Sequence, residues 1–128
     1  MKRLLLTLLL LVFTSVTAFS QNLYLRASTF NIGKKSTEST AISWGTAVPV
    51  NILIQIEENK ATIFTQTKQV YRLISTTEER VGYVKYYCTN DDGINCNLIV
   101  FSLPEYPGHI YFTVEFSDYI WYYVAKKE

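Results

Sequence analysis

The sequence predicts an all-β domain, an antiparallel meander of six or seven strands that forms a small barrel or a two-layer sandwich. Between residues 23 and 125 the apolar residues recur with period two rather than 3.6, which indicates strands instead of helices. Thr, Ile, Val and Tyr, which suit a pleated surface, are frequent in these segments. Short turns join most of them, as expected for an antiparallel meander. Sequence alone does not choose between the barrel and the sandwich.

The first 20 residues have the three-part pattern of a secretory signal peptide. Lys2 and Arg3 precede an apolar run over residues 4–13, and small and polar residues follow as far as Ser20. The apolar run is shorter than the roughly 20 residues that a membrane-spanning helix needs. We therefore expect cleavage after Ser20, a single β-domain over residues 21–128, and a secreted or periplasmic product. The residue directly after the cleavage site is Gln21 and not the Cys that a lipoprotein signal needs for acylation, so we expect no stable membrane anchor after cleavage.

The expected strands cover most of the domain. Residues 109–118 alternate most clearly, because Ile110, Phe112, Val114 and Phe116 share one face and polar residues occupy most of the other. The remaining strands are expected over residues 23–30, 50–56, 61–75, 81–89, 95–103 and 119–126.

Three stretches between these strands are expected to be turns or loops. Residues 57–60, EENK, predict a hairpin turn. Residues 104–108, PEYPG, predict a loop, because both prolines remove backbone donors and the glycine permits a turn. Residues 33–46 are the least regular stretch, and we expect a surface loop that contains Trp44.

The two cysteines lie on either side of a short polar loop, and an exported protein would usually pair them. A three-residue loop over residues 91–93 opposes Asn90 to Ile94 and Cys88 to Cys96, whereas a two-residue turn would place the thiols on opposite faces. The three-residue loop also fits the turn chemistry, since Gly93 takes the left-handed position. We therefore predict a Cys88–Cys96 disulfide across a hairpin, rather than a metal or redox site.

Charge and motifs argue against several classes of function. Removing Lys2 and Arg3 from the 12 Lys and Arg leaves 10, against 11 Asp and Glu, so the mature chain is almost neutral and nucleic-acid binding is not expected. His109 is the only histidine, and no nucleophile or carboxylate motif accompanies it. We expect no metal, no cofactor and no enzymatic activity.

Aromatic residues are the most unusual feature of the chain. All ten tyrosines and both tryptophans follow residue 20, and they are densest in residues 119–123, YIWYY. In a strand, Tyr119, Trp121 and Tyr123 share one face and Ile120, Tyr122 and Val124 share the other. One row must be core, and the other would then be exposed or line a pocket. The sequence does not decide which, and tyrosine is also a common strand former.

The last 50 residues carry a resemblance. The order Tyr-Tyr-Cys, Asn-Asp-Asp-Gly, Cys and then Phe-Ser-Asp-Tyr-Ile-Trp, together with the signal peptide, resembles a family of short exported bacterial all-β proteins with no known activity. The resemblance implies an exported β-domain and carries no functional residue.

The leading hypothesis is a non-enzymatic exported domain that recognises a protein surface or a glycan through aromatic residues. Its candidate binding residues are Tyr119, Trp121, Tyr123 and Trp44. Two alternatives stay open: a lipocalin-like carrier, which requires a cavity inside a barrel, and a small hydrolase.

Overall fold

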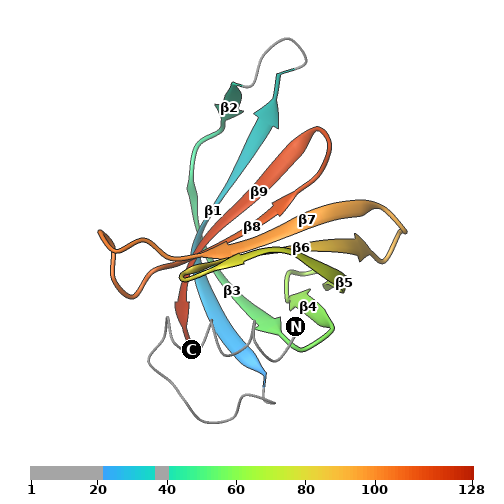
Figure 1. Cartoon of the computed structure of the whole chain (residues 1–128). Helices are drawn as coiled ribbons and strands as arrows, with labels where there is room; N and C mark the ends of the chain where they lie inside the picture. Colours follow the sequence, from blue (N-terminus) through green and yellow to red (C-terminus); the bar gives the residue numbers. More distant parts are fainter. Residues whose placement is uncertain (1–21, 37–40) are drawn as a thin grey trace.

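The computed structural model describes residues 22–36 and 41–128 as one antiparallel sheet that closes into a barrel (Figure 1). The strands are β1 (Leu23–Lys35), β2 (Ile42–Trp44), β3 (Val48–Ile56), β4 (Lys60–Ile63), β5 (Gln69–Arg80), β6 (Tyr83–Asn90), β7 (Asn95–Phe101), β8 (Ile110–Glu115) and β9 (Tyr119–Lys127). The all-β class is confirmed, and of the two architectures it is the barrel that forms. The expected signal peptide, residues 1–20, lies outside the described residues.

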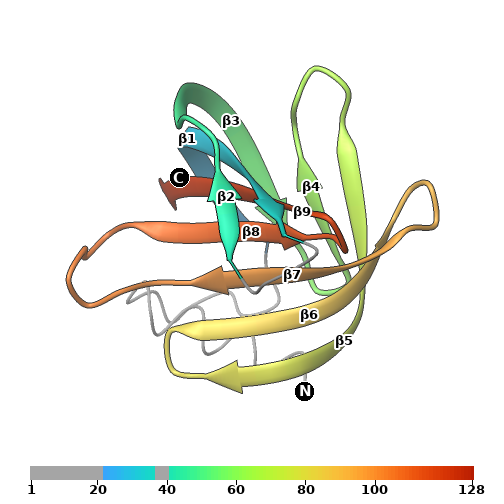
Figure 2. The ribbon, with the colours of Figure 1, turned by 90° about the horizontal axis from the view of Figure 1, so that it is seen from above.

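The barrel closes because β1 pairs with β3 on one side and with β9 on the other. Eight strands form the ring, and β2 pairs only with the far end of β1. Figure 2 shows β1, β3 and β9 on one side of the barrel and β5 and β6 on the other. Bulges in β1 and β5 let these long strands bend around the core. No helix in the described part of the chain is long and apolar enough to cross a membrane.

Nine strands form rather than six or seven, for two reasons. The expected strand over residues 61–75 is divided into β4 and β5, because the chain turns at residues 64–68, where the Thr65 hydroxyl donates a 2.6 Å hydrogen bond to the Thr67 carbonyl. The expected loop over residues 33–46 was wrong at both ends, since β1 continues to Lys35 and β2 pairs with it. Residues 37–40 of that loop lie outside the described residues.

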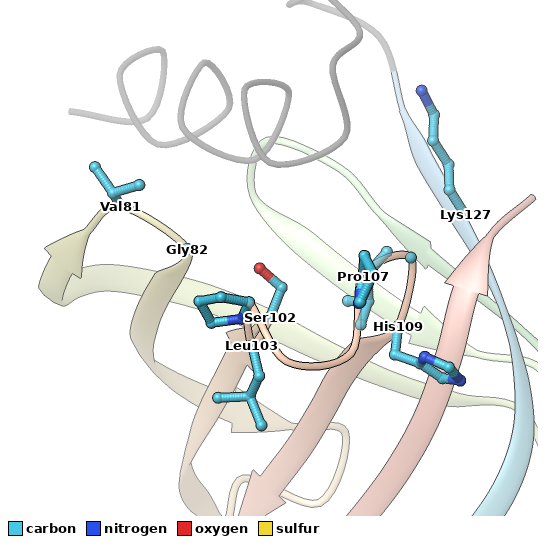
Figure 3. A pocket seen from close by; sticks show the side chains of 10 residues that line it. Val81, Gly82, Ser102, Leu103, Pro107, His109 and Lys127 are labelled. Carbon is cyan, nitrogen blue, oxygen red and sulfur yellow. The ribbon is translucent and has the colours of Figure 1, made fainter.

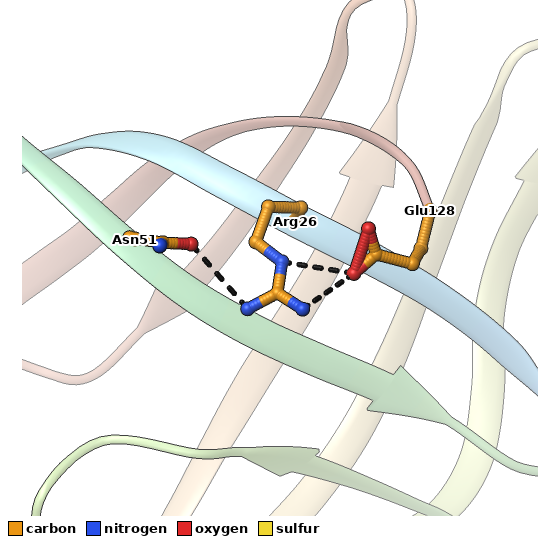
Figure 4. A network of polar contacts seen from close by, with 3 residues as sticks. All are labelled: Arg26, Asn51 and Glu128. Atoms are coloured by element: carbon orange, nitrogen blue, oxygen red, sulfur yellow. Dashed lines mark hydrogen bonds and ion pairs between the residues drawn. The ribbon is translucent and has the colours of Figure 1, made fainter.

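Side chains from every strand of the ring fill the barrel. The inward residues of β6 and β7 are Val84, Tyr86, Cys88, Cys96, Leu98 and Val100, all buried, as the predicted hairpin register requires. The other strands contribute mainly Leu, Ile, Val and aromatic side chains to the same cluster. On the outside of the barrel, β1 and the C-terminal residue are joined, because Arg26 donates hydrogen bonds to Glu128 at 2.8 and 2.5 Å and to Asn51 at 3.3 Å (Figure 4). An exposed pair of this kind contributes at most about 1 kcal/mol.

Candidate recognition site

The pairing of β9 with β8 shows which face of β9 points into the core. Trp121 opposes Val114 and Tyr123 opposes Phe112, and both partners are fully buried, so Trp121 and Tyr123 face the core. Tyr123 is only 2% exposed. Tyr119, at the start of the strand, is 46% exposed. A binding role for these three residues stays a prediction, but the structure does not gather them into one exposed row.

Trp121 packs at one end of the core. Its ring meets Phe30 edge-on at a centroid distance of 6.3 Å and Phe116 at 5.5 Å. Phe30 in turn lies 4.8 Å from the Tyr123 ring. These contacts indicate that Trp121 supports the fold, and that its loss would cost packing.

The outer face of the barrel carries a different set of rings, which we call the aromatic row: Trp44, Tyr122, Tyr111, Phe101 and Tyr83. Successive ring centroids are 5.5, 5.9, 5.0 and 6.4 Å apart. The row passes from β2 to β6, and the Arg80 guanidinium lies 3.9 Å from the centroid of the Tyr83 ring at its end. The row therefore crosses six neighbouring strands, in the order β2, β1, β9, β8, β7 and β6.

Strand register explains most of the row. Tyr83 opposes Phe101, and Phe101 opposes Tyr111, so these three rings share the outer face of β6, β7 and β8. Tyr111 opposes Val124 on β9, and its ring stacks with the diagonal neighbour Tyr122. Aromatic cross-strand pairs of this kind stabilise a sheet, so the row also has a structural role.

Trp44 reaches the row across β1, because residue 33 is glycine. Trp44 pairs with Gly33 on one side of β1, while Tyr122 lies on the other side. A Cβ atom at Gly33 would lie 2.8 Å from Cζ3 of the Trp44 ring and 2.8 Å from Cγ2 of Ile42. The absence of that atom lets the indole lie on the backbone of β1 and contact Tyr122.

The rings in the row differ in what they offer to a partner. Phe101, Tyr111 and Tyr122 are nearly parallel, with interplanar angles of 19° and 17°, so they cover each other's faces and leave Tyr111 only 8% exposed. Burial, and next to it the neighbouring Tyr111 phenol, raises the pKa of Tyr122. Trp44 is tilted by 59° to Tyr122 and is 47% exposed. It is therefore the ring in the row with the most surface free for a ligand.

The cysteine hairpin has the register that the sequence predicts. Cys88 opposes Cys96 between β6 and β7, the Asn90 amide donates to the Ile94 carbonyl at 3.0 Å, and Gly93 has a φ of 79°. The two Sγ atoms are 3.2 Å apart and unbonded in this structure, so the disulfide itself stays a prediction. The hydrogen bond with Cys96, together with burial, raises the pKa of the Cys88 thiol, which would make a reduced Cys88 a poor nucleophile.

His109 lies just before β8 and does not form a recognisable catalytic group. Its ring is 6.5 Å from that of Tyr106, and its Nδ1 is buried without a hydrogen-bond partner. A catalytic histidine needs a partner that orients it. Within residues 22–36 and 41–128, no group of three or more His, Cys, Asp and Glu could hold a metal ion. The expected absence of enzymatic activity stays a prediction.

Sequence reasoning found part of this site and missed the rest. The predicted hairpin register, which opposes Cys88 to Cys96, also puts Tyr83 opposite Phe101. The alternation over residues 109–118 predicts a solvated face that includes Tyr111 and Thr113, and this was wrong, because these residues are only 8% and 6% exposed. The sequence did not predict that Tyr122 and Trp44 belong to the same row. Their place in it depends on the pairing of β1 with both β2 and β9. The available signal was Gly33, a glycine in an otherwise regular strand, which often marks a close approach of another group.

No family model matches the chain, and no curated protein and no solved structure matches it significantly.

Proposed function

We propose that this protein is an exported, non-enzymatic β-barrel domain that recognises a protein surface or a glycan through its aromatic row. The observation that supports this most is the exposed Trp44 ring at the end of a row that is otherwise packed against itself. Rigid aromatic side chains bury a large area at low cost in conformational entropy, and for that reason they dominate many binding surfaces. Tyr122 contacts Trp44 directly and would hold it in place, and Tyr111 and Phe101 support Tyr122 in turn.

Export is part of the same proposal. Cleavage after Ser20 would release the domain, and an oxidising compartment would join Cys88 to Cys96. The two sulfur atoms already face each other inside the hairpin, so bridging them requires only a small movement. The predicted cross-link would hold β6 and β7, which carry Tyr83 and Phe101.

The packed interior favours surface recognition over the lipocalin-like carrier. Large side chains such as Tyr71, Phe112 and Tyr123 are fully buried at the centre of the ring. A carrier with its ligand deep inside would need interior positions that leave a space instead.

A binding screen with a matched pair of variants tests the proposal. The purified protein is used to capture proteins and is screened against a glycan array, and each interaction found is then measured with Trp44→Ala and Phe64→Ala. Phe64 is also aromatic and is 40% exposed, but it lies outside the aromatic row. We expect Trp44→Ala to weaken binding about tenfold or more, as for an anchoring aromatic residue, and Phe64→Ala to leave it unchanged.

Two results would contradict this assignment. One is a specific partner whose affinity is the same for Trp44→Ala and the unmodified protein, with both folded. The other is a screen in which the protein captures no protein and no glycan. Thermal unfolding of each variant shows whether a loss of binding comes from a loss of fold.

A further inference from the structure

A pocket lies at one mouth of the barrel, far from the aromatic row's Trp44 end. It has a volume of about 590 Å³ and is formed by the β5–β6 turn, the loop between β7 and β8, and the last residues of β9 (Figure 3). This volume is within the range of about 300–1,000 Å³ that small-molecule sites occupy. Its apolar lining consists of Val81, Leu103, Pro104, Pro107 and Ile110.

The apolar side of the pocket includes a residue whose position is unusual. Val81 is 85% exposed, more than any other large hydrophobic residue in the described part of the chain. Ile110, at the start of β8, is only 2% exposed and belongs to the core. The pocket therefore extends from the exposed Val81 at its rim to the buried Ile110 at the edge of the barrel core. This arrangement suits an aliphatic chain.

The polar side of the pocket is basic. Ser102, His109 and Lys127 line it, and no Asp or Glu does. Lys127 opposes Leu25, whose side chain is fully buried, so it lies on the inward face of β9 at the mouth. Four salt bridges join described residues, and none of them includes Lys127. Figure 3 shows its side chain extending away from Ser102 and His109, so the ammonium group lies at the outer rim of the opening, where an anionic head group could reach it.

Two acidic residues lie near this end: Glu105, exposed in the loop between β7 and β8, and Glu79 on β5. Glu79 opposes Val84 on the inward face of β5, and its Oε2 atom is buried without a hydrogen-bond partner. Neither Glu79 nor Glu105 lines the pocket. A ligand with a cationic or donor head would favour Glu79, whereas an anionic head would favour Lys127.

We propose that the barrel mouth binds a free aliphatic carboxylate, with the hydrocarbon chain against Val81, Leu103 and Ile110 and the carboxylate next to Lys127. Ser102 and His109 provide further donors at the same opening. The site shares no residue with the aromatic row, although it adjoins the Tyr83 end of it, so it goes beyond the recognition function proposed above.

Three ligands with the same chain test the head group. Titration of the purified protein, below the critical micelle concentrations, compares dodecanoate, dodecanol and dodecyltrimethylammonium. We expect dodecanoate to bind most tightly and the cation most weakly. Equal affinity for dodecanoate and dodecanol would refute the role of charge, and tighter binding of the cation would point to Glu79 and overturn the proposal.

Neighbouring lysines on β9 provide a matched pair of variants. Lys127→Gln removes the charge at the mouth, whereas Lys126→Gln removes one from the outer face, where Lys126 opposes Arg26. We expect Lys127→Gln to weaken dodecanoate binding about three- to tenfold and leave dodecanol binding unchanged, with no effect of Lys126→Gln on either. The same loss for both lysines would indicate a general charge effect and contradict the site.

The hydrocarbon chain has its own controls. Val81→Ser should weaken dodecanoate binding, whereas Ile94→Ser, at an exposed apolar position in the β6–β7 hairpin, should not. Each buried methylene contributes about fourfold, so decanoate should bind about an order of magnitude more weakly than dodecanoate. Failure of free dodecanoate to bind would overturn the proposal, even where the protein sediments with anionic phospholipid vesicles, because a membrane surface would then be the target.

Discussion

Gly33→Ala provides the sharpest test of how the aromatic row is built. The new methyl carbon would lie 2.8 Å from both the Trp44 ring and Ile42, closer than real contacts allow. The backbone of β1 can accept alanine, because Gly33 does not have the positive φ that Gly82, Gly93 and Gly108 have. The indole must therefore move away from β1 and from Tyr122.

The expected size of the effect follows from the exposure of Trp44. A tryptophan side chain buries up to about 250 Å². Trp44 is 47% exposed, so roughly half of that area is covered, which corresponds to about 3 kcal/mol at about 25 cal/mol/Å². A gap of about 0.5–1 Å forfeits a quarter to a half of the contact energy, or about 1 kcal/mol. Weakened stacking on Tyr122 adds to this loss of stability. Alanine also lowers the conformational entropy of the unfolded chain, which offsets about 0.4–1 kcal/mol of the loss.

The net expectation is a protein destabilised by about 1 kcal/mol, with a melting temperature about 4 °C lower. Urea unfolding measures the change, and a Trp121→Phe background isolates the fluorescence of Trp44, which should shift to the red. The control combines Ile42→Ala and Trp44→Ala, which remove both contacting side chains. In that background Gly33→Ala should be neutral or stabilising, and an equal destabilisation in both backgrounds would refute the argument.

Two further predictions concern the core. If Cys88 and Cys96 are joined, the intact mass is lower by two hydrogen atoms than that of the reduced protein, and reduction lowers the unfolding free energy by about 2–3 kcal/mol; identical masses would exclude the bridge. Burial raises the pKa of Tyr123 to about 12, so the folded state keeps a proton that the unfolded chain loses near pH 10. The contribution of Tyr123 to the free energy of unfolding is complete below pH 10 and is lost as the pH rises towards 12, by about 3 kcal/mol in total. Tyr123→Phe should therefore reduce the slope of the unfolding free energy against pH in that interval.

Local chemistry made the β6–β7 hairpin predictable from sequence. The loop length, the left-handed position of Gly93 and the alignment of the cysteines depend on residues within a few positions of one another, and each favours the same register. Alternation over residues 109–118 likewise placed Phe112 and Val114 in the core. Such features need no knowledge of the rest of the chain.

The closure of the barrel and the faces of β9 could not be predicted in the same way. Both faces of β9 carry large apolar side chains, so the alternation there does not indicate which face is buried. Its orientation is set by pairing with β8 and with β1, whose residues lie about a hundred positions earlier in the chain. The same long-range pairing brings β2 to β1 and turns an expected loop into the strand that carries Trp44.

The structural role of the aromatic row and the recognition role that we propose for it fall on different residues. In the middle, Phe101 and Tyr111 stack face to face, so their substitution would mainly lower stability. At the end, Trp44 lies against Gly33 and contacts Tyr122, and 47% of it stays exposed. A substitution at Trp44 should change binding with a smaller cost to the fold than one at Tyr111, because less of its surface is buried. Recognition and stability can thus be measured independently in one continuous set of side chains.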